Sequence, residues 1–299
     1  MDNDDVPIGR VLDRREAVRL LAMSGAAVLV GCNRGSANAA DSSVAIAAAR
    51  DSTAKSTQLP GCVVKPELTV GPYFLDNQLE RRDIRDGKPG AMLQLTFLVS
   101  QITGGQCKPL EGAVVDVWHC DASGAYSGFN DRMEGFNTVG QKFLRGYQKT
   151  SSTGAAAFTT IYPGWYRGRT VHIHFKIRAP WAPGTQVTDA GKQYDFTSQL
   201  FFDDTFTDRV FASAPYNAKG ARDLRNSSDG IFRQSGDSLL LNVGTVTNSD
   251  HALQGYAATF EIGLDLSDTK VGAEDRMGGP GPGGAPPFRE GAPPPPPRS

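Results

Sequence analysis

Hydrophobic and polar residues alternate strictly over residues 170–177 of the chain. The apolar positions of this segment are Val171, Ile173, Phe175 and Ile177. The polar positions are Thr170, His172, His174 and Lys176. A period of two is typical of a β-strand, in which successive side chains point to opposite faces. His172 and His174 therefore share one face of the predicted strand, and both imidazoles can reach the same point.

Other segments rich in β-branched and aromatic residues lie between clusters of Gly, Pro, Asn and Asp. They predict strands at residues 92–99, 113–119, 156–161, 171–177, 198–202, 238–246 and 257–264. Short helical turns are expected around residues 203–212 and 218–225, and no long amphipathic helix is indicated. Seven strands at this spacing favour an all-β fold, a single-domain β-sandwich whose site is built on long loops.

The first 39 residues have the features of an export signal. Arg14 and Arg15 precede an apolar run at residues 20–30, which is too short for a membrane span and indicates a twin-arginine signal. Two endings fit this segment: a lipoprotein-like box at residues 29–32, in which Cys32 is acylated, or an Ala-Asn-Ala cleavage site at residues 37–39. We expect an exported protein that is periplasmic, extracellular or attached to a membrane through Cys32.

Composition divides the remainder of the chain into three parts. Residues 40–60 are rich in Ala, Ser and Thr without a hydrophobic period, which predicts a flexible linker. Residues 61–267 are numerous enough to bury a complete core and form the predicted β-sandwich. Residues 268–299 are dominated by Gly and Pro, with a proline run at residues 293–297, and predict an extended, disordered tail.

Charge narrows the range of partners. The sequence has 31 Lys and Arg against 32 Asp and Glu, for a formal net charge of −1, and no basic stripe. This balance disfavours nucleic acid and acidic membrane surfaces as partners.

Of the four cysteines, Cys32 belongs to the leader. Cys62 and Cys107 lie in polar, loop-like segments of a protein predicted to be exported, and we expect a disulfide between them. Cys120 directly follows the apolar segment at residues 113–119, which predicts a buried free thiol.

The histidine pair of the 170–177 segment has two interpretations. A single His-x-His on a strand is more often hydrogen-bonded or exposed than metal-bound, so a metal site needs a second source of ligands. A Pro-Gly turn at residues 163–164 allows the phenol of Tyr166 to fold back toward the same face. Tyr126 lies in a loop that begins where the strand at residues 113–119 ends, a place where scaffolds often present ligands.

The other two histidines are assigned no part in this site. His119 follows Trp118 on a buried strand and is expected to be a structural histidine with its hydrogen bonds satisfied. His251 lies in a polar loop and receives no role.

Four motifs occur in order along the central part of the chain. They are Thr-Val-Gly-Pro-Tyr-Phe at residues 69–74, Val-Trp-His-Cys-Asp-Ala-Ser-Gly-Ala-Tyr-Ser at 117–127, Pro-Gly-Trp-Tyr at 163–166 and Arg-Thr-Val-His-Ile-His-Phe at 169–175. Together they resemble the intradiol ring-cleavage dioxygenases, a family that includes the protocatechuate and catechol enzymes. The resemblance covers residues 66–202, and the chain is most similar to exported, single-domain members of this family.

The resemblance implies a mononuclear ferric iron bound by Tyr126, Tyr166, His172 and His174. It also implies that Arg169 and Gln199 flank the substrate ring, with Arg169 stabilising charge there. The loop between Tyr166 and His172 is shorter than in the protocatechuate enzymes, which leaves Tyr162 as an alternative to Tyr166. The Pro-Gly-x-Tyr pattern favours Tyr166.

The implied activity is the cleavage of a catechol-type ring by O2 between its two hydroxylated carbons, giving a muconate-type diacid. Ferric iron is a hard Lewis acid and favours anionic phenolate ligands, which fits the tyrosine pair. Two alternatives remain: a β-sandwich that binds iron or an aromatic compound without turnover, and a cupin-like Fe(II) dioxygenase, which the lack of a carboxylate in the motif disfavours.

Overall fold

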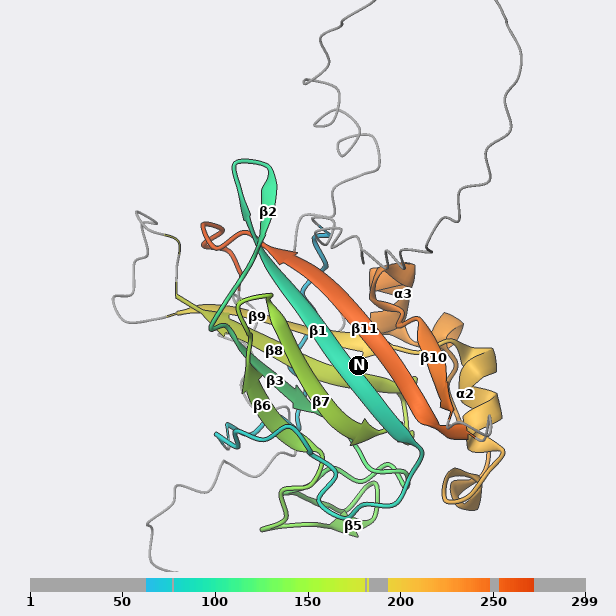
Figure 1. Cartoon of the computed structure of the whole chain (residues 1–299). Helices are drawn as coiled ribbons and strands as arrows, with labels where there is room; N and C mark the ends of the chain where they lie inside the picture. Colours follow the sequence, from blue (N-terminus) through green and yellow to red (C-terminus); the bar gives the residue numbers. More distant parts are fainter. Residues whose placement is uncertain (1–62, 77, 181, 183–192, 248–252, 272–299) are drawn as a thin grey trace, which may run out of the picture. The chain divides into compact units, whose positions relative to one another are not determined.

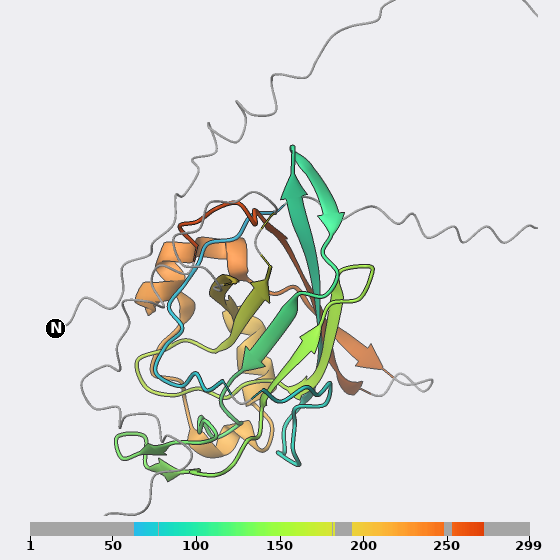
Figure 2. The same cartoon turned by 90° about the vertical axis from the view of Figure 1, so that its left-hand side faces the viewer.

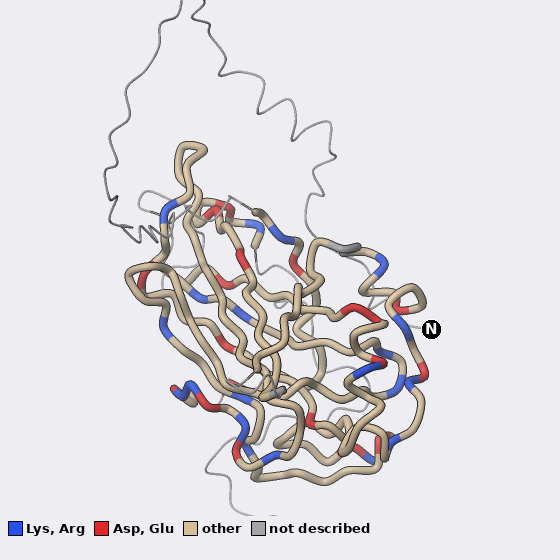
Figure 3. Tube along the Cα trace, turned by 45° about the vertical axis from the view of Figure 1, so that its right-hand side comes forward, with Lys and Arg blue, Asp and Glu red and all other residues tan. Residues whose placement is uncertain are grey.

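The computed structural model describes residues 63–76, 78–180, 182, 193–247 and 253–271 of the chain. The predicted export signal, the linker at residues 40–60, Cys32, Cys62 and His251 all lie outside these residues, as does most of the predicted tail. Among the described residues, no helix is both long and apolar enough to cross a membrane. Lys and Arg are interspersed with Asp and Glu along the trace (Figure 3).

The predicted all-β fold is confirmed, because two sheets hold most of the regular structure of the described residues. The first sheet is centred on β1 (Met92–Thr103) and contains β2 (Gln106–Pro109), β7 (Ala155–Ile161), β10 (Val243–Thr247) and β11 (Leu253–Leu264). Its central strand pairs in parallel with β11 and antiparallel with β7 (Figure 1).

The second sheet has the order β6-β3-β8-β9 and is antiparallel throughout. Its strands are β6 (Arg145–Lys149), β3 (Val114–Trp118), β8 (His172–Ala179) and β9 (Tyr194–Phe201). A small hairpin joins β4 (Asn130–Asp131) to β5 (Phe136–Asn137). The helical segments are α2 (Asp204–Phe211), η1 (Tyr216–Lys219), η2 (Asn226–Ser228), α3 (Gly230–Ser235) and η3 (Gly236–Leu239), which gather on one side of the sheets in Figures 1 and 2.

The core forms between the two sheets because each contributes one apolar face. Phe97 of β1 lies with its ring centroid 5.3 Å from that of Phe175 on β8, and it also contacts Phe158 and Phe260. Ile173, Phe175 and Ile177 belong to the same buried cluster, as their alternation predicted. The polar residues of β8 consequently face away from this core.

This second face of β8 is nevertheless buried, because the segment at residues 66–74 lies against the sheet. Leu68 donates its N–H to the carbonyl of Thr197, and Ser198 and Gln199 donate to the carbonyls of Pro66 and Thr69. His172 and His174 are 2% and 1% exposed. The histidine pair thus lies in a closed environment of low polarity, where an unpaired polar atom is costly.

Several elements differ from the sequence prediction. Residues 238–246 were predicted to be one strand, but the segment begins in η3 and only Val243–Thr247 forms β10. Its run of leucines has no period of two, and Leu239 and Leu241 pack into the core from a non-strand backbone. Strand β6 was not predicted, because Arg-Gly-Tyr-Gln-Lys has no apolar alternation and its register is set by pairing with β3.

The helical turn expected around residues 218–225 is wrong for most of that segment, because η1 ends at Lys219 and residues 220–225 form no helix. The other helix and the thiols have the following outcomes. Cys107 is disulfide-bonded, while Cys62 lies outside the described residues. Cys120 is a buried free thiol, as predicted. The helix expected at residues 203–212 is α2, and its first turn is capped by the carboxylate of Asp203, which accepts from the N–H of Phe206 at 2.8 Å.

We expect Phe97→Ala to lower the free energy of unfolding by about 3–5 kcal/mol, because truncation leaves a cavity where three aromatic rings meet. Leu98, the next residue of β1, is only partly buried and provides a matched control. Leu98→Ala should cost clearly less in the same denaturant titration. Equal losses for the two variants would contradict the assignment of the β1 faces.

Candidate metal centre

The site residues come from the ends of neighbouring strands. Tyr126 follows β3, Tyr166 lies between β7 and β8, and His172 and His174 belong to β8. Across the sheet, His174 is aligned with Trp118 of β3 on one side and Gln199 of β9 on the other. The strand pairing therefore fixes the position of the histidine pair.

Packing orients the ring of His174. Its imidazole is stacked on Trp118, with centroids 5.0 Å apart and an interplanar angle of 8°. Gly71 lies against the ring, since a Cβ on this residue would be 3.0 Å from His174 Cε1, and its φ of +70° favours glycine. His174 Nδ1 has no hydrogen-bond partner among the described residues, so packing against Trp118 and Gly71 and the contact of its Nε2 with His172 Nε2 hold this ring.

A hydrogen bond orients the ring of His172. Its Nδ1 lies 2.7 Å from the carbonyl oxygen of Thr170, which only accepts, so Nδ1 carries the proton and the lone pair of the neutral ring is on Nε2. That single lone pair is 3.2 Å from the Tyr166 hydroxyl and 3.1 Å from His174 Nε2. It can accept only one hydrogen bond, so the three polar atoms cannot all be satisfied by each other.

Tyr126 completes the cluster. Its ring is fully buried and stacked on Tyr73, with centroids 4.3 Å apart and an interplanar angle of 13°. It also contacts Tyr166 and His174 edge-on, at centroid distances of 5.6 and 6.3 Å. The Tyr126 hydroxyl is buried and makes no hydrogen bond within 3.5 Å among the described residues, but it lies close enough to Tyr166 to lower the pKa of that phenol.

Two glycines allow the loops that carry the tyrosines to approach each other. A Cβ on Gly124 would lie 2.1 Å from the carbonyl oxygen of Trp165, and one on Gly164 would lie 2.4 Å from that of Asp121. Both contacts are with backbone, so any larger residue would force the loops apart. The Ser-Gly-Ala-Tyr segment and the Pro-Gly segment therefore belong to two loops that are in close backbone contact.

Burial keeps this cluster neutral in the absence of a cation. It raises the pKa of Tyr126 well above its usual value, with the nearby Tyr166 adding to the shift. It raises the pKa of Tyr166 to about 12, although the Arg169 cation acts in the opposite direction. Burial also lowers the pKa values of His172 and His174 well below 6.5, and both imidazoles are therefore neutral donors of a lone pair.

Tyr162, the alternative to Tyr166, lies elsewhere. Its ring packs in the core against Phe202, and its hydroxyl is 2.7 Å from Thr207 Oγ1. The geometry therefore favours Tyr166. His119 is a satisfied structural histidine as predicted, with its ring nitrogens 2.8 Å from the carbonyl of Cys120 and 2.7 Å from Thr160 Oγ1.

Arg169 and Gln199 lie together beside the cluster. Arg169 Nη2 donates to Gln199 Oε1 at 2.6 Å, and its Nε donates to Asp229 Oδ2 at 2.9 Å. Asp229 was not identified from the sequence, where its only signal is that of a helix cap before α3. Tyr73 was noted only within its motif, and nothing in the sequence revealed that it stacks on Tyr126.

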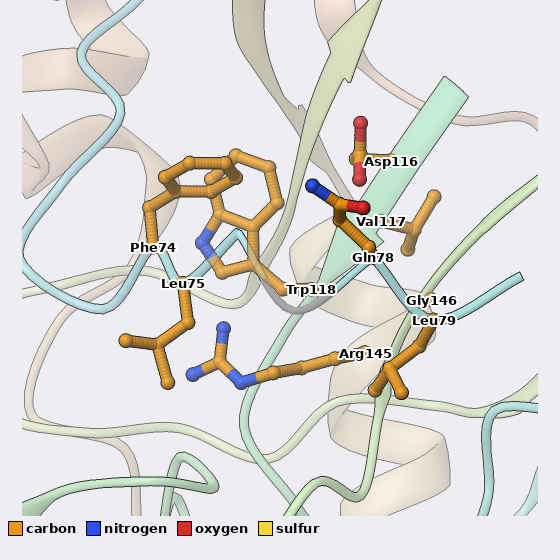
Figure 4. Close-up of a pocket in the computed structure, with 9 residues that line it drawn as sticks. All are labelled: Phe74, Leu75, Gln78, Leu79, Asp116, Val117, Trp118, Arg145 and Gly146. Carbon is orange, nitrogen blue, oxygen red and sulfur yellow. The ribbon is translucent and has the colours of Figure 1, made fainter. Parts of the chain in front are cut away.

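Two pockets lie near the site. The pocket in Figure 4 has a volume of ≈ 10 Å³, enough for one water molecule. It is lined by Trp118 and Arg145, whose buried Nε1 and Nη1 atoms have no hydrogen-bond partner among the described residues. A larger pocket of ≈ 350 Å³ is lined by residues 123–125, which precede Tyr126, by residues 134–136, and by Lys219. Its volume lies in the range of small-molecule sites.

The residues present fit a metal ion. Two imidazole nitrogens and two phenol oxygens come together with one hydroxyl unpaired and one lone pair approached by two groups, and a central cation would satisfy all four atoms. Within the described part of the chain, no group of three or more His, Cys, Asp or Glu could hold a metal. The candidate donors are two imidazoles and two phenols, a set that would suit a hard trivalent ion.

Comparison with known proteins identifies the family. A family described as "Dioxygenase" matches residues 69–229, more than half of the chain. The structure of an intradiol ring-cleavage dioxygenase from Tetranychus urticae is similar with a TM-score of 0.57 and 30% identity, covering 69% of this chain and 96% of that one. The chain belongs to the intradiol ring-cleavage dioxygenase family.

Curated relatives match over shorter segments. Chlorocatechol 1,2-dioxygenase from Cupriavidus pinatubonensis is 28% identical over 134 residues, covering 37% of this chain and 48% of the relative. Hydroxyquinol 1,2-dioxygenase from Corynebacterium glutamicum is 29% identical over 135 residues, covering 38% and 42%. The chain thus spans about half the length of the curated relatives it matches.

We expect the metal-free protein to lose stability as the pH falls below about 6.5. His119, His172 and His174 are buried with lowered pKa values, so the unfolded chain takes up protons in this range that the folded chain does not. Each histidine contributes a slope approaching about 1.4 kcal/mol per pH unit. Denaturant titrations between about pH 6.5 and 5 measure it, and a stability independent of pH would contradict the neutral, buried state of the three rings.

Proposed function

We propose that the chain is a non-haem Fe(III) dioxygenase that uses O2 to cleave a catechol-type ring between its two hydroxylated carbons. The observation that carries this proposal is the buried meeting of Tyr166 Oη, His172 Nε2 and His174 Nε2 within 3.2 Å contacts, with the unpaired Tyr126 hydroxyl beside them. Tyr126, Tyr166, His172 and His174 would hold the iron. Membership of the family supports the reaction class.

The protonation states of these residues favour a trivalent ion. Both phenols are protonated in the metal-free site because burial raises their pKa values. Metal binding therefore displaces a proton from each, and the two resulting phenolates offset two of the three positive charges. His172 presents its Nε2 lone pair to the site because Thr170 holds the proton on Nδ1.

An iron ion held by Tyr126, Tyr166, His172 and His174 would supply a Lewis acid for a catechol-type ring. Tyr166 is 9% exposed whereas Tyr126 is fully buried and stacked on Tyr73, and we assign to Tyr166 the role of accepting a catechol proton at Oη. Arg169, positioned by Gln199, places a fixed positive charge where negative charge develops on the ring.

The substrate class follows from the size and chemistry of the site. A pocket of ≈ 350 Å³ is lined by residues 123–125 of the loop that leads to Tyr126, and a single-ring catechol fits this volume. Relatives act on chlorocatechol and hydroxyquinol according to their names. Catechol, hydroxyquinol and the carboxylated ring of protocatechuate are therefore the first compounds to compare.

The direct experiment measures iron content, visible absorption and O2 uptake of the iron-loaded protein with these three catechols. We expect a phenolate-to-iron charge-transfer band and consumption of O2 with formation of a ring-opened diacid. Tyr166→Phe should lower turnover roughly 100-fold because it removes the proton acceptor. Tyr162→Phe is the matched control and should lose only about 1 kcal/mol of stability with its Thr207 hydrogen bond.

Two results of this experiment would contradict different parts of the proposal. Iron binding and colour without O2 uptake on any of the three compounds would indicate a binding module instead of an enzyme. Loss of colour and turnover in Tyr162→Phe, with both retained in Tyr166→Phe, would show that the second tyrosine ligand is wrongly assigned.

A second prediction concerns the contact between Gly71 and the imidazole ring of His174. Gly71→Ala should lower iron affinity about tenfold or more, because the new Cβ displaces the imidazole. Gly87 has a similar φ of +76°, and a Cβ on it would have no other atom within 4 Å, so Gly87→Ala reproduces the backbone strain alone. Competition with a chelator measures both affinities, and equal affinities in the two variants would rule out the proposed contact.

A further inference from the structure

We propose that Asp229 is a positioning residue for this reaction, and that one of its carboxylate oxygens sets the place of the Arg169 guanidinium relative to the His172 ring. The inference rests on the proposed function for its catalytic meaning, but the contacts that carry it are independent of iron. Asp229 contributes no ligand and lies just before α3, outside the strands that hold the site.

The carboxylate of Asp229 is fully engaged. Its Oδ2 accepts from Arg169 Nε at 2.9 Å and from the backbone N–H of Thr170 at 2.8 Å. Its Oδ1 accepts from the N–H of Phe232 at 2.9 Å, which ties it to the first turn of α3. The side chain is 1% exposed, and the partner arginine side chain is 15% exposed. This is an ion pair largely removed from solvent, and breaking it would leave a buried charge without compensation.

Thr170 transmits the position of Asp229 to the metal site. Its N–H binds Asp229 Oδ2, while its own carbonyl accepts the Nδ1 proton of His172 at 2.7 Å. Its hydroxyl donates to Asn226 Oδ1 at 2.6 Å, and Asn226 in turn donates to the carbonyl of Phe202 at 2.8 Å. Asp229 Oδ2 therefore holds both the Arg169 guanidinium and the backbone N–H of Thr170, and the carbonyl of Thr170 in turn holds the His172 ring.

The same contacts restrict Arg169 to one orientation. Nε is used by Asp229 and one Nη2 hydrogen by Gln199, whose amide nitrogen donates to the carbonyl of Thr69 at 3.1 Å. In the proposed reaction, the third guanidinium nitrogen, Nη1, would donate to the bound ring. A long, flexible side chain becomes a fixed donor because two of its nitrogens are anchored.

A role limited to capping α3 is the simpler explanation of a buried Asp before a helix. A lost cap costs about 1 kcal/mol of stability but does not change the orientation of Arg169. The two roles can therefore be distinguished by measuring how firmly Arg169 is held, because the loss of a helix cap changes stability without changing the orientation of Arg169.

The first experiment uses metal-free protein. Exchange of the Arg169 Nε–H proton with solvent is followed by 1H–15N NMR in wild type, Asp229→Asn and Asp223→Asn. Asp223 is the matched control, because it is an exposed carboxylate that accepts from the N–H of Gly168, next to Arg169, at 2.9 Å. We expect exchange to accelerate at least tenfold in Asp229→Asn only. An unchanged exchange rate in Asp229→Asn would overturn the proposal.

The second experiment is a double-mutant cycle on the iron-loaded protein with catechol. We expect Asp229→Asn to lower kcat about 10–100-fold and Arg169→Gln about 100–1000-fold, with the double variant no slower than Arg169→Gln alone. Losses that multiply in the double variant, or a kcat of Asp229→Asn equal to that of Asp223→Asn, would show that Asp229 does not act through Arg169. A wild-type protein that binds iron but consumes no O2 would reject the proposed function, while the exchange measurement would still decide the anchoring.

Discussion

The structure depends on one constraint: two neutral imidazoles are held on the same face of β8 with their Nε2 atoms 3.1 Å apart in a buried place. A period of two along the strand creates the pair, and the flanking strands fix it, because His174 is aligned with Trp118 and Gln199. Burial keeps both rings uncharged. Their lone pairs are thereby kept available for a cation.

The tyrosines add the charge that the histidines lack. Their loops meet through Gly124 and Gly164, where backbone touches backbone and no Cβ fits. Each phenol is protonated by virtue of its burial, so a cation must displace protons to bind. In the proposed iron centre, a weakly acidic ion would gain little from such a site, whereas a hard trivalent ion would gain two anionic ligands.

Much of the fold and part of the site follow from local patterns. The alternation at residues 170–177 identified β8 and its two faces, and the Pro-Gly turn before Tyr166 indicated the second phenol. Strand β6 was missed because its side chains carry no apolar period and pairing alone defines it. The leucines at residues 239–241 were wrongly predicted to lie in a strand, because apolar residues also enter a core from a 3-10 turn.

Contacts between distant segments account for what the sequence did not show. Tyr73 stacks on Tyr126 from 53 positions away, and Asp229 reaches Arg169 across 60. Neither residue has a local signature of its role, because each acts through a partner that only the folded chain brings near. The helical region after β9 therefore has a part in the site although it provides none of the four donors.

The measurement that tests the central claim most directly is anomalous X-ray diffraction at the iron absorption edge from crystals of the iron-loaded protein. We predict one strong peak per chain, within bonding distance of Tyr126 Oη, Tyr166 Oη, His172 Nε2 and His174 Nε2. A peak bound elsewhere, or bound by the histidines without either phenol, would contradict the account.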